Sequence, residues 1–213
     1  MKVIGFTAKV GGGKDTAGAL VTEILQEQGY KVTKLSFAKM LKDICTMMFG
    51  WDRQRLEHDF DYKEGYTLDD GTIDPACEML SRDREDGMQI TRRIVMQLMG
   101  TEAMRNGLHL DIWVIALELA IKRGEYAKYD YGLLTDCRFL NELNFVRRNG
   151  GKLVKIYRDG DATTLTDQTQ HVSELEWEQW SAWDHEIRNH VDPSKTPEEN
   201  LRAFKETLRT VVS

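Results

Sequence analysis

The stretch AKVGGGKDT, residues 8–16, combines three consecutive glycines with a lysine, a carboxylate and a hydroxyl. In a phosphate-binding loop of the form GxxxxGK[S/T], glycines let backbone N–H groups surround the phosphate oxygens, and the lysine reaches the outer phosphates. Gly13 and Lys14 match this pattern. Ala8 replaces the first glycine, and Asp15 takes the place of the hydroxyl, which follows one residue later. The stretch predicts a phosphate cradle, and the alternative is a tight turn built from glycines alone.

Asp15 and Thr16 are both candidate ligands for Mg²⁺ in such a cradle. A phosphate loop normally uses the hydroxyl after its lysine to bind the metal, whereas a carboxylate there adds negative charge beside a triphosphate. Asp15 could ligate the metal directly or through water, and Thr16 could supply the hydroxyl instead. Because Thr16 could equally be an ordinary residue of the first helical turn, the choice between the two stays open.

The residues around the cradle predict the strand and the helix that it needs. MKVIGFT, residues 1–7, is a short apolar run typical of a buried strand. After the loop, apolar residues recur at helical spacing as far as Gly29, a residue typical of a helix end. They are Ala17, Leu20, Val21, Ile24 and Leu25. The positive N-terminal end of this helix would face an anion bound in the loop.

The rest of the chain alternates between predicted strands and helices, which is the order of a parallel α/β sheet flanked by helices. Further strands are predicted at 31–37, 131–136 and 152–159, with an edge strand at 185–191. Helices are predicted at 38–50, 90–100, 111–124, 138–151 and 172–180, and from Pro197, where Leu201, Phe204, Leu208 and Val211 share a face. We interpret 1–213 as one domain, with 51–88 as a substrate-side insertion and about 158–171 as a lid-like loop.

Asp136 closes a predicted strand at its carboxyl end and Arg138 follows two residues later, at the edge where open parallel sheets bind ligands. The alternative for this pair is a helix N-cap beside a surface ion pair. Trp113 lies on an apolar helical face, which is typical of core packing, although such a ring can also stack on a base. Other cations that could meet an acceptor phosphate, each more often a solvated surface charge, are Lys39, Lys42, Arg92, Arg93, Arg105 and Arg158.

Composition limits the classes of partner. The net charge of −6 gives no general basic field, so we expect binding neither to nucleic acid nor to an anionic membrane. Cys45, Cys77 and Cys137 form no CxxC pair, so a disulfide framework or a zinc site is not predicted. Without a signal-peptide pattern or a long apolar run, the expected location is the cytoplasm, or the host cytoplasm for a viral chain.

The cradle and the cations together favour a small kinase. The sequence contains no NKxD, which a guanine-reading switch protein would carry, and no second strong nucleotide motif of a motor ATPase. A kinase must hold ATP and Mg²⁺ in line with an acceptor and place cations on the developing charge. The acceptor would be a phosphate oxygen that is already ionised, so we predict no general base.

Several stretches, in this order, resemble the phage deoxynucleoside monophosphate kinase family. They are GGGKDT (11–16), SFAKMLK (36–42), RRIVMQLMGTEAMR (92–105), DIW (111–113) and TDCRFLNE (135–142). The resemblance covers most of the chain and makes the aspartate after the lysine a family trait. It implies a P-loop kinase that transfers the γ-phosphoryl group of ATP to a deoxynucleoside 5′-monophosphate.

The resemblance also implies site residues. ATP would be held by Gly11, Gly13, Lys14, Asp15 and Thr16. The acceptor would be held by Gly100, Thr101, Trp113, Asp136, Arg138 and Glu142. To the acceptor site we add the cations Lys42 and Arg93. Lys14 and Arg138 are the predicted catalytic residues, one stabilising the transferring group and the other the acceptor phosphate. Leu140 stands where the family often has proline, and residues 51–88 match poorly, which leaves base choice open.

Three other functions are weighed against this one. A kinase of another small phosphate, such as phosphomevalonate or dephospho-coenzyme A, can carry a similar GKD loop. A regulator would bind ATP without acceptor-dependent ADP release, and a scaffold with a plain glycine turn would not bind ATP. The pairs Gly100–Thr101 and Asp136–Arg138 favour a nucleotide acceptor. The sequence leaves open the sugar preference and the oligomeric state, including a homodimer.

Overall fold

The computed structural model describes residues 1–9, 11–57, 67–68, 71–82, 84–158 and 176–212. The chain forms two compact units. The first unit comprises residues 1–37 and 117–213, and the second comprises residues 38–116. The predicted lid-like loop, about 158–171, lies outside the described residues except for Arg158.

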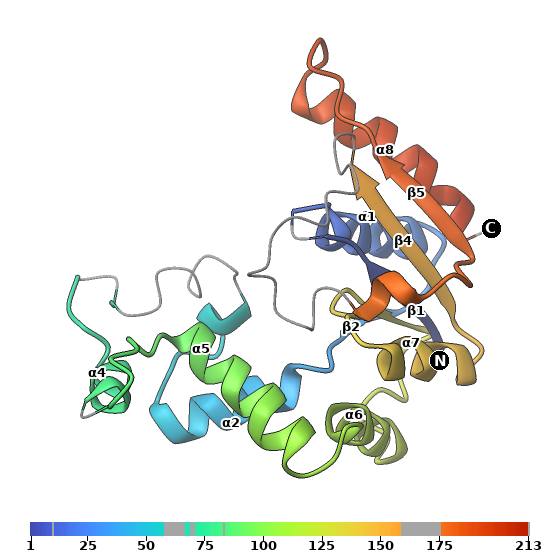
Figure 1. Ribbon diagram of the computed structural model, residues 1–213. Helices are drawn as coiled ribbons and strands as arrows, with labels where there is room; N and C mark the ends of the chain where they lie inside the picture. The colour runs from blue at the N-terminus through green and yellow to red at the C-terminus, as the bar shows by residue number, and fades with distance from the viewer. Residues whose placement is uncertain (10, 58–66, 69–70, 83, 159–175, 213) are drawn as a thin grey trace. The chain divides into compact units, whose positions relative to one another are not determined.

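The first unit is built on a five-stranded sheet in the order β2-β3-β1-β4-β5, and every neighbouring pair of strands is parallel (Figure 1). Its elements are β1 (Lys2–Thr7), α1 (Lys14–Glu27), β2 (Val32–Leu35), β3 (Tyr131–Leu134), α7 (Leu140–Arg148), β4 (Lys152–Arg158), η4 (Glu176–Gln179), β5 (His185–Asn189) and α8 (Pro197–Val212). The predicted α/β class with a parallel sheet is confirmed, as is the edge position of the last strand.

Helices cover both faces of this sheet, and successive strand residues point alternately toward one face or the other. Ile4 and Phe6 of β1 belong to the buried cluster that includes side chains of α1 and α8. Gly5 lies between them and points the other way, where a Cβ would be 3.0 Å from Val146 of α7. The sheet is therefore packed between α1 and α8 on one side and α7 on the other (Figure 1).

The helix after the glycine loop forms as its apolar spacing predicts. All five members of the predicted stripe are buried in α1, and full burial of a side chain as large as Val21, Ile24 or Leu25 contributes about 1.5–3 kcal/mol. The helix ends at Glu27, and Gly29 follows with a φ of 85°, a conformation that favours glycine. In α8, Phe204, Leu208 and Val211 are buried, but Leu201 is 44% exposed, so the predicted stripe is one residue too long.

The second unit is mainly helical. It contains α2 (Lys39–Phe49), η1 (Arg55–Glu57), α4 (Pro75–Ser81), α5 (Arg92–Gln97) and η2 (Leu98–Asn106), and α6 (Ile112–Lys122) runs from it into the first unit. The helix predicted to stop at Gly100 is therefore wrong at its end, since η2 carries the helical chain through that glycine. A Cβ at Gly100 would lie 2.8 Å from Leu41, so the glycine permits a close approach of α2. Among the described residues, none of the helices is both long and apolar enough to cross a membrane.

Candidate active site

The glycine loop joins β1 to α1 through backbone conformations that favour glycine. Gly11 has a φ of 77° and Gly13 a φ of 96°, both in the left-handed region. Gly12 closes a turn by donating its N–H to the carbonyl of Lys9 at 2.9 Å. Gly13 is the N-cap of α1, and it provides no side-chain cap for the first-turn N–H groups of that helix. These N–H groups and the positive end of the helix suit an anion.

Asn189 supports this loop from the end of the edge strand β5. Its Nδ2 donates to the carbonyl oxygen of Gly12 at 3.2 Å, and the residue is 8% exposed. A Cβ at Gly13 would lie only 2.4 Å from the same nitrogen. Glycine at this position therefore serves two purposes, the positive φ and the close approach of an amide from another strand.

Asp15 lies between the lysine of the loop and a hydroxyl from the next strand. Its Oδ2 is 2.9 Å from Nζ of Lys14, and its Oδ1 accepts a hydrogen bond of 2.7 Å from Oγ1 of Thr135. Partial burial alone would raise the pKa of Asp15, but the Lys14 bond and charge, together with the Thr135 bond, outweigh it and lower the pKa. Asp15 is therefore ionised at neutral pH.

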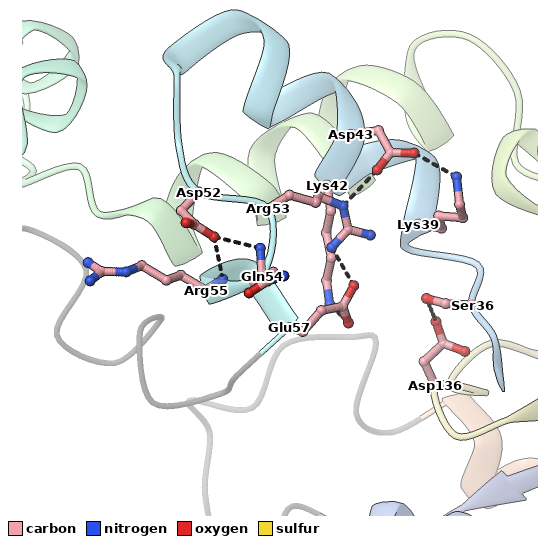
Figure 2. Close-up of polar contacts among 10 residues, drawn as sticks. All are labelled: Ser36, Lys39, Lys42, Asp43, Asp52, Arg53, Gln54, Arg55, Glu57 and Asp136. Carbon is pink, nitrogen blue, oxygen red and sulfur yellow. Dashed lines mark hydrogen bonds and ion pairs between the residues drawn. The ribbon is translucent and has the colours of Figure 1, made fainter.

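The carboxyl ends of the parallel strands meet at one edge, and polar side chains are paired there. Oγ of Ser36, just after β2, donates to Oδ2 of Asp136, which follows β3, at 2.6 Å (Figure 2). Oγ1 of Thr7, the last residue of β1, donates to the carbonyl of Cys137 at 2.7 Å. Asp136 is thus hydrogen-bonded to the residue that follows β2 and does not directly precede α7, which begins at Leu140.

Glu142 fixes the backbone of the segment that carries Arg138. Its Oε2 accepts from the N–H of Arg138 at 2.8 Å and from the N–H of Phe139 at 3.2 Å. Glu142 is 3% exposed, and Arg138 is half-buried. The structure therefore gives Glu142 a capping function at the start of α7, and its predicted contact with an acceptor stays a prediction.

In the second unit, Lys42 belongs to an ion-pair network. Its Nζ lies 2.9 Å from Oε2 of Glu57, and Glu57 also pairs with Arg53 (Figure 2). Nε of Arg53 lies 2.6 Å from Asp43, whose other oxygen is 2.8 Å from Nζ of Lys39. Burial would raise the pKa of Glu57, but the bonds from Lys42 and Arg53 lower it. Lys42 is 9% exposed and is neutralised within its own unit.

The remaining predicted residues of the second unit lie on neighbouring helices. Nε1 of Trp113 donates to the carbonyl of Gly100 at 2.9 Å, and Trp113 is 5% exposed. The indole therefore packs in the core of its unit, which is the core-packing alternative weighed for this tryptophan. Thr101 of η2 and Arg93 of α5 are both half-buried.

Three residues at the ends of strands escape prediction from the sequence. Ser36, Thr135 and Asn189 hold Asp136, Asp15 and the carbonyl of Gly12, respectively. Each stands at or directly after the carboxyl end of a strand. The rule that ligands bind at that edge could have marked all three as candidates.

The fold and the loop define a class. A parallel sheet whose first strand runs into a glycine loop, followed by a helix that begins with lysine, is the arrangement of a P-loop nucleotide-binding protein. The family model described as deoxynucleotide monophosphate kinase matches residues 63–190, more than half of the chain. The chain belongs to this family, and it is therefore a phosphotransferase.

Two viral relatives agree with the family. One, from Acanthamoeba polyphaga mimivirus, is provisionally named a deoxynucleotide monophosphate kinase and is 29% identical, with 86% of each chain covered. The other, the deoxynucleoside-5′-monophosphate kinase of Escherichia phage T5, is 26% identical over 68% of this chain and 71% of its own. Among solved structures, the protein APE1195 is 14% identical with a TM-score of 0.37, covering 100% of this chain and 97% of that one.

Proposed function

We propose that the chain transfers the γ-phosphoryl group of ATP to a deoxynucleoside 5′-monophosphate, giving a deoxynucleoside diphosphate and ADP. Family membership supports the reaction class. The observation that carries the ATP side is the position of Lys14, the first residue of α1, directly after a glycine loop with two left-handed glycines. The first-turn N–H groups of α1 would bind phosphate oxygens, and the Lys14 ammonium would stabilise charge on the transferring group.

On the acceptor side, the phosphate of the nucleotide is itself the nucleophile. Its oxygens are ionised near neutral pH, so the reaction needs positioning and charge neutralisation and no general base. Arg138 would neutralise the acceptor phosphate, because a guanidinium can make two parallel hydrogen bonds to phosphate oxygens. The backbone bonds from Glu142 would hold the Arg138 segment in one conformation. Asp136, kept in place by Ser36, would take part in binding the nucleotide.

The loop also offers suitable ligands for Mg²⁺. The cation prefers oxygen ligands, and Asp15 presents a carboxylate, 58% exposed, that is ionised at neutral pH, with the exposed hydroxyl of Thr16 beside it. These two residues would hold the metal, directly or through water, together with the phosphates. When bound, the cation would neutralise charge on the β- and γ-phosphates.

For the second unit we propose that Lys42, Arg93, Gly100, Thr101 and Trp113 also serve the acceptor nucleotide. This proposal rests on the family resemblance of the stretches that contain them. Single substitutions test it, because a residue that binds the acceptor changes the KM of the nucleotide and leaves the KM of ATP unchanged. We further propose that residues 51–88 decide which bases are accepted.

The decisive experiment measures ADP release from ATP and Mg²⁺ with each common dNMP, each NMP, phosphomevalonate and dephospho-coenzyme A, supplied singly. We expect release with one or more dNMPs, and formation of the matching dNDP. Lys14→Met should abolish transfer while the far-UV circular dichroism stays that of the native chain. Release only with phosphomevalonate or dephospho-coenzyme A, or ATP binding without any acceptor-dependent release, would refute the proposal.

A further inference from the structure

Thr135 reaches the glycine loop from the neighbouring strand. It follows directly after β3, is 6% exposed, and donates its hydroxyl to Oδ1 of Asp15 at 2.7 Å. β3 pairs with β1, so the register of the sheet brings a residue 120 positions away beside the first turn of α1. None of the functions assigned above uses this hydroxyl.

Gly18 makes room for Thr135 on the same face of the helix. A Cβ at Gly18 would lie 2.5 Å from Cγ2 of Thr135, which no side chain could tolerate without a shift. Gly18 stands three residues after Asp15, so the two positions are neighbours on the helix surface. Glycine inside a helix costs roughly 0.5–1 kcal/mol relative to alanine, so its presence needs a reason, and the close approach of the threonine methyl supplies one.

The contact matters because Asp15 stands beside the lysine of the loop. Its second oxygen lies 2.9 Å from Nζ of Lys14, and the lysine side chain is only 15% exposed. A carboxylate bonded to the lysine alone could rotate about its side-chain bonds and carry the ammonium away from one fixed position. The Thr135 hydroxyl binds the first oxygen and so limits that rotation. Because threonine is β-branched and its methyl packs at Gly18, the hydroxyl itself has little freedom.

We propose that Thr135 is a positioning residue for the phosphate loop, fixing Asp15 and, through it, Lys14. This inference rests on the proposed function of the loop. In this role Thr135 itself does not contact a substrate. Loss of the hydroxyl disturbs the interaction with ATP and leaves the acceptor nucleotide bound as before.

The test compares Thr135→Val, which keeps the shape and removes the donor, with Thr135→Ser, which keeps the donor and removes the methyl. Steady-state kinetics are measured with ATP varied at saturating dNMP, and the reverse. We expect kcat/KM for ATP to fall about tenfold or more in the valine variant, the loss typical of one hydrogen bond to a charged group. The KM of the dNMP should stay unchanged, and the serine variant should keep most of the activity.

A second set of variants tests the packing step. Gly18→Ala should reproduce the defect of Thr135→Val, although alanine favours the helix. Adding Thr135→Ser to Gly18→Ala removes the methyl that the new Cβ would meet, so the double variant should recover activity. The matched control is Thr207→Val in α8, whose hydroxyl donates to the carbonyl of Phe204 at 2.7 Å, far along the chain from the loop.

The results distinguish a failure of the proposed role of Thr135 from a failure of the proposed kinase function. A valine variant as active as the wild type, a serine variant as impaired as the valine variant, or a double variant that stays impaired would overturn the role of Thr135. A wild-type protein inactive with every dNMP would instead refute the proposed function. In that case calorimetric binding of a non-hydrolysable ATP analogue still tests the inference, since Thr135→Val should weaken binding and Thr207→Val should not.

Discussion

Nδ2 of Asn189 donates to the carbonyl oxygen of Gly12 at 3.2 Å, which joins the last residue of the edge strand β5 to the glycine loop after β1. These strands are not neighbours, because β4 lies between them. The bond fixes the orientation of the peptide between Gly12 and Gly13. Since the N–H of Gly13 belongs to that peptide, the edge strand helps to define the geometry of the proposed phosphate cradle.

We predict that Asn189→Ala raises the KM of ATP by roughly threefold to tenfold, the size expected for one neutral hydrogen bond of about 0.5–1.5 kcal/mol. Asn189→Asp should have a larger effect, because a carboxylate cannot donate to the Gly12 carbonyl and would repel the phosphates. The KM of the dNMP should change little in either variant. Steady-state kinetics with each substrate varied in turn provide the measurement.

Asn149→Ala is the control for this prediction. Nδ2 of Asn149 donates to the carbonyl of Phe145 at 2.8 Å, so the control loses a similar bond away from the loop. If the two alanine variants shift the melting temperature alike and neither changes the KM of ATP, Asn189 is only structural.

A second prediction concerns the pairing of Lys42 with Glu57. If Lys42 binds the acceptor phosphate as proposed, the phosphate must first displace the Glu57 carboxylate, which lies 2.9 Å from the ammonium. Glu57→Gln should therefore lower the KM of the dNMP, by up to about fivefold, since a partly exposed ion pair is worth about 0.2–1 kcal/mol. The measurement is initial rate against dNMP concentration at saturating ATP.

Glu125→Gln provides the matched control, because Glu125 pairs with Arg123 at 2.7 Å outside the proposed site. It should leave both KM values unchanged. A rise in the KM of the dNMP for Glu57→Gln would mean that the carboxylate orients Lys42 and does not compete with the acceptor.

The cysteines give a third prediction. Burial raises the pKa of Cys45 to about 11, and burial together with the charge of Asp74 raises that of Cys77 to about 12. Cys137 is buried as well, with a pKa well above the ordinary value. Because the thiolate is the reactive form and only about one thousandth or less of Cys45 and Cys77 is ionised at pH 8, these cysteines should react slowly.

Iodoacetamide at pH 8 should therefore leave the native chain unmodified and add three groups after denaturation in urea, as read by intact mass. Rapid modification of one cysteine in the native protein would show that the element carrying it opens readily.

The sheet was predictable because local patterns specify it. The apolar runs at β1, β3 and β4 predict strands, and the apolar stripe of α1 predicts a helix. The structure contains each of them. The end of the helix predicted over 90–100 is wrong for a physical reason. Glycine commonly ends a helix by adopting a positive φ, but here it lies inside η2 and admits a side chain of α2. Contacts between distant segments decide such positions, and one sequence does not reveal them.

The part of the proposed site that belongs to one local motif was predictable. The part that depends on the order of the strands was not. Residue types and spacing, with the strand before and the helix after, predict the loop from Gly11 to Thr16, and the structure gives Gly11 and Gly13 left-handed conformations that favour glycine. Thr135 and Asn189 gain their importance from the strand order, which brings β3 and β5 to the loop. Nothing near either residue in the sequence indicates its partner.

A final prediction concerns Asp74, the N-cap of α4 in the second unit. It is 2% exposed and accepts bonds from the N–H groups of Ala76 and Cys77, from Nε1 of Trp51, and from Arg92, whose NH2 lies 2.9 Å away. Asp74→Asn keeps the shape but leaves the Arg92 charge buried without its counter-ion. Breaking a buried ion pair in this way costs about 3–5 kcal/mol, so the free energy of unfolding in urea should fall by that amount at pH 7.

The same variant predicts a pH dependence. Burial would raise the pKa of Asp74, but the Cys77 N–H, Arg92 and Trp51 bonds outweigh it and lower the pKa from 3.8. A lowered pKa in the folded state means that the stabilisation is complete above the unfolded value and is lost as pH falls through the folded value. The difference in free energy of unfolding between wild type and Asp74→Asn should thus be constant from about pH 5 to 8 and shrink below about pH 4.

Asp86→Asn is the control, because it removes one charge of an exposed ion pair with Arg84. It should change the free energy of unfolding little at pH 7. Equal free energies of unfolding for wild type and Asp74→Asn at pH 7 would mean that shape, and not charge, is what Asp74 contributes.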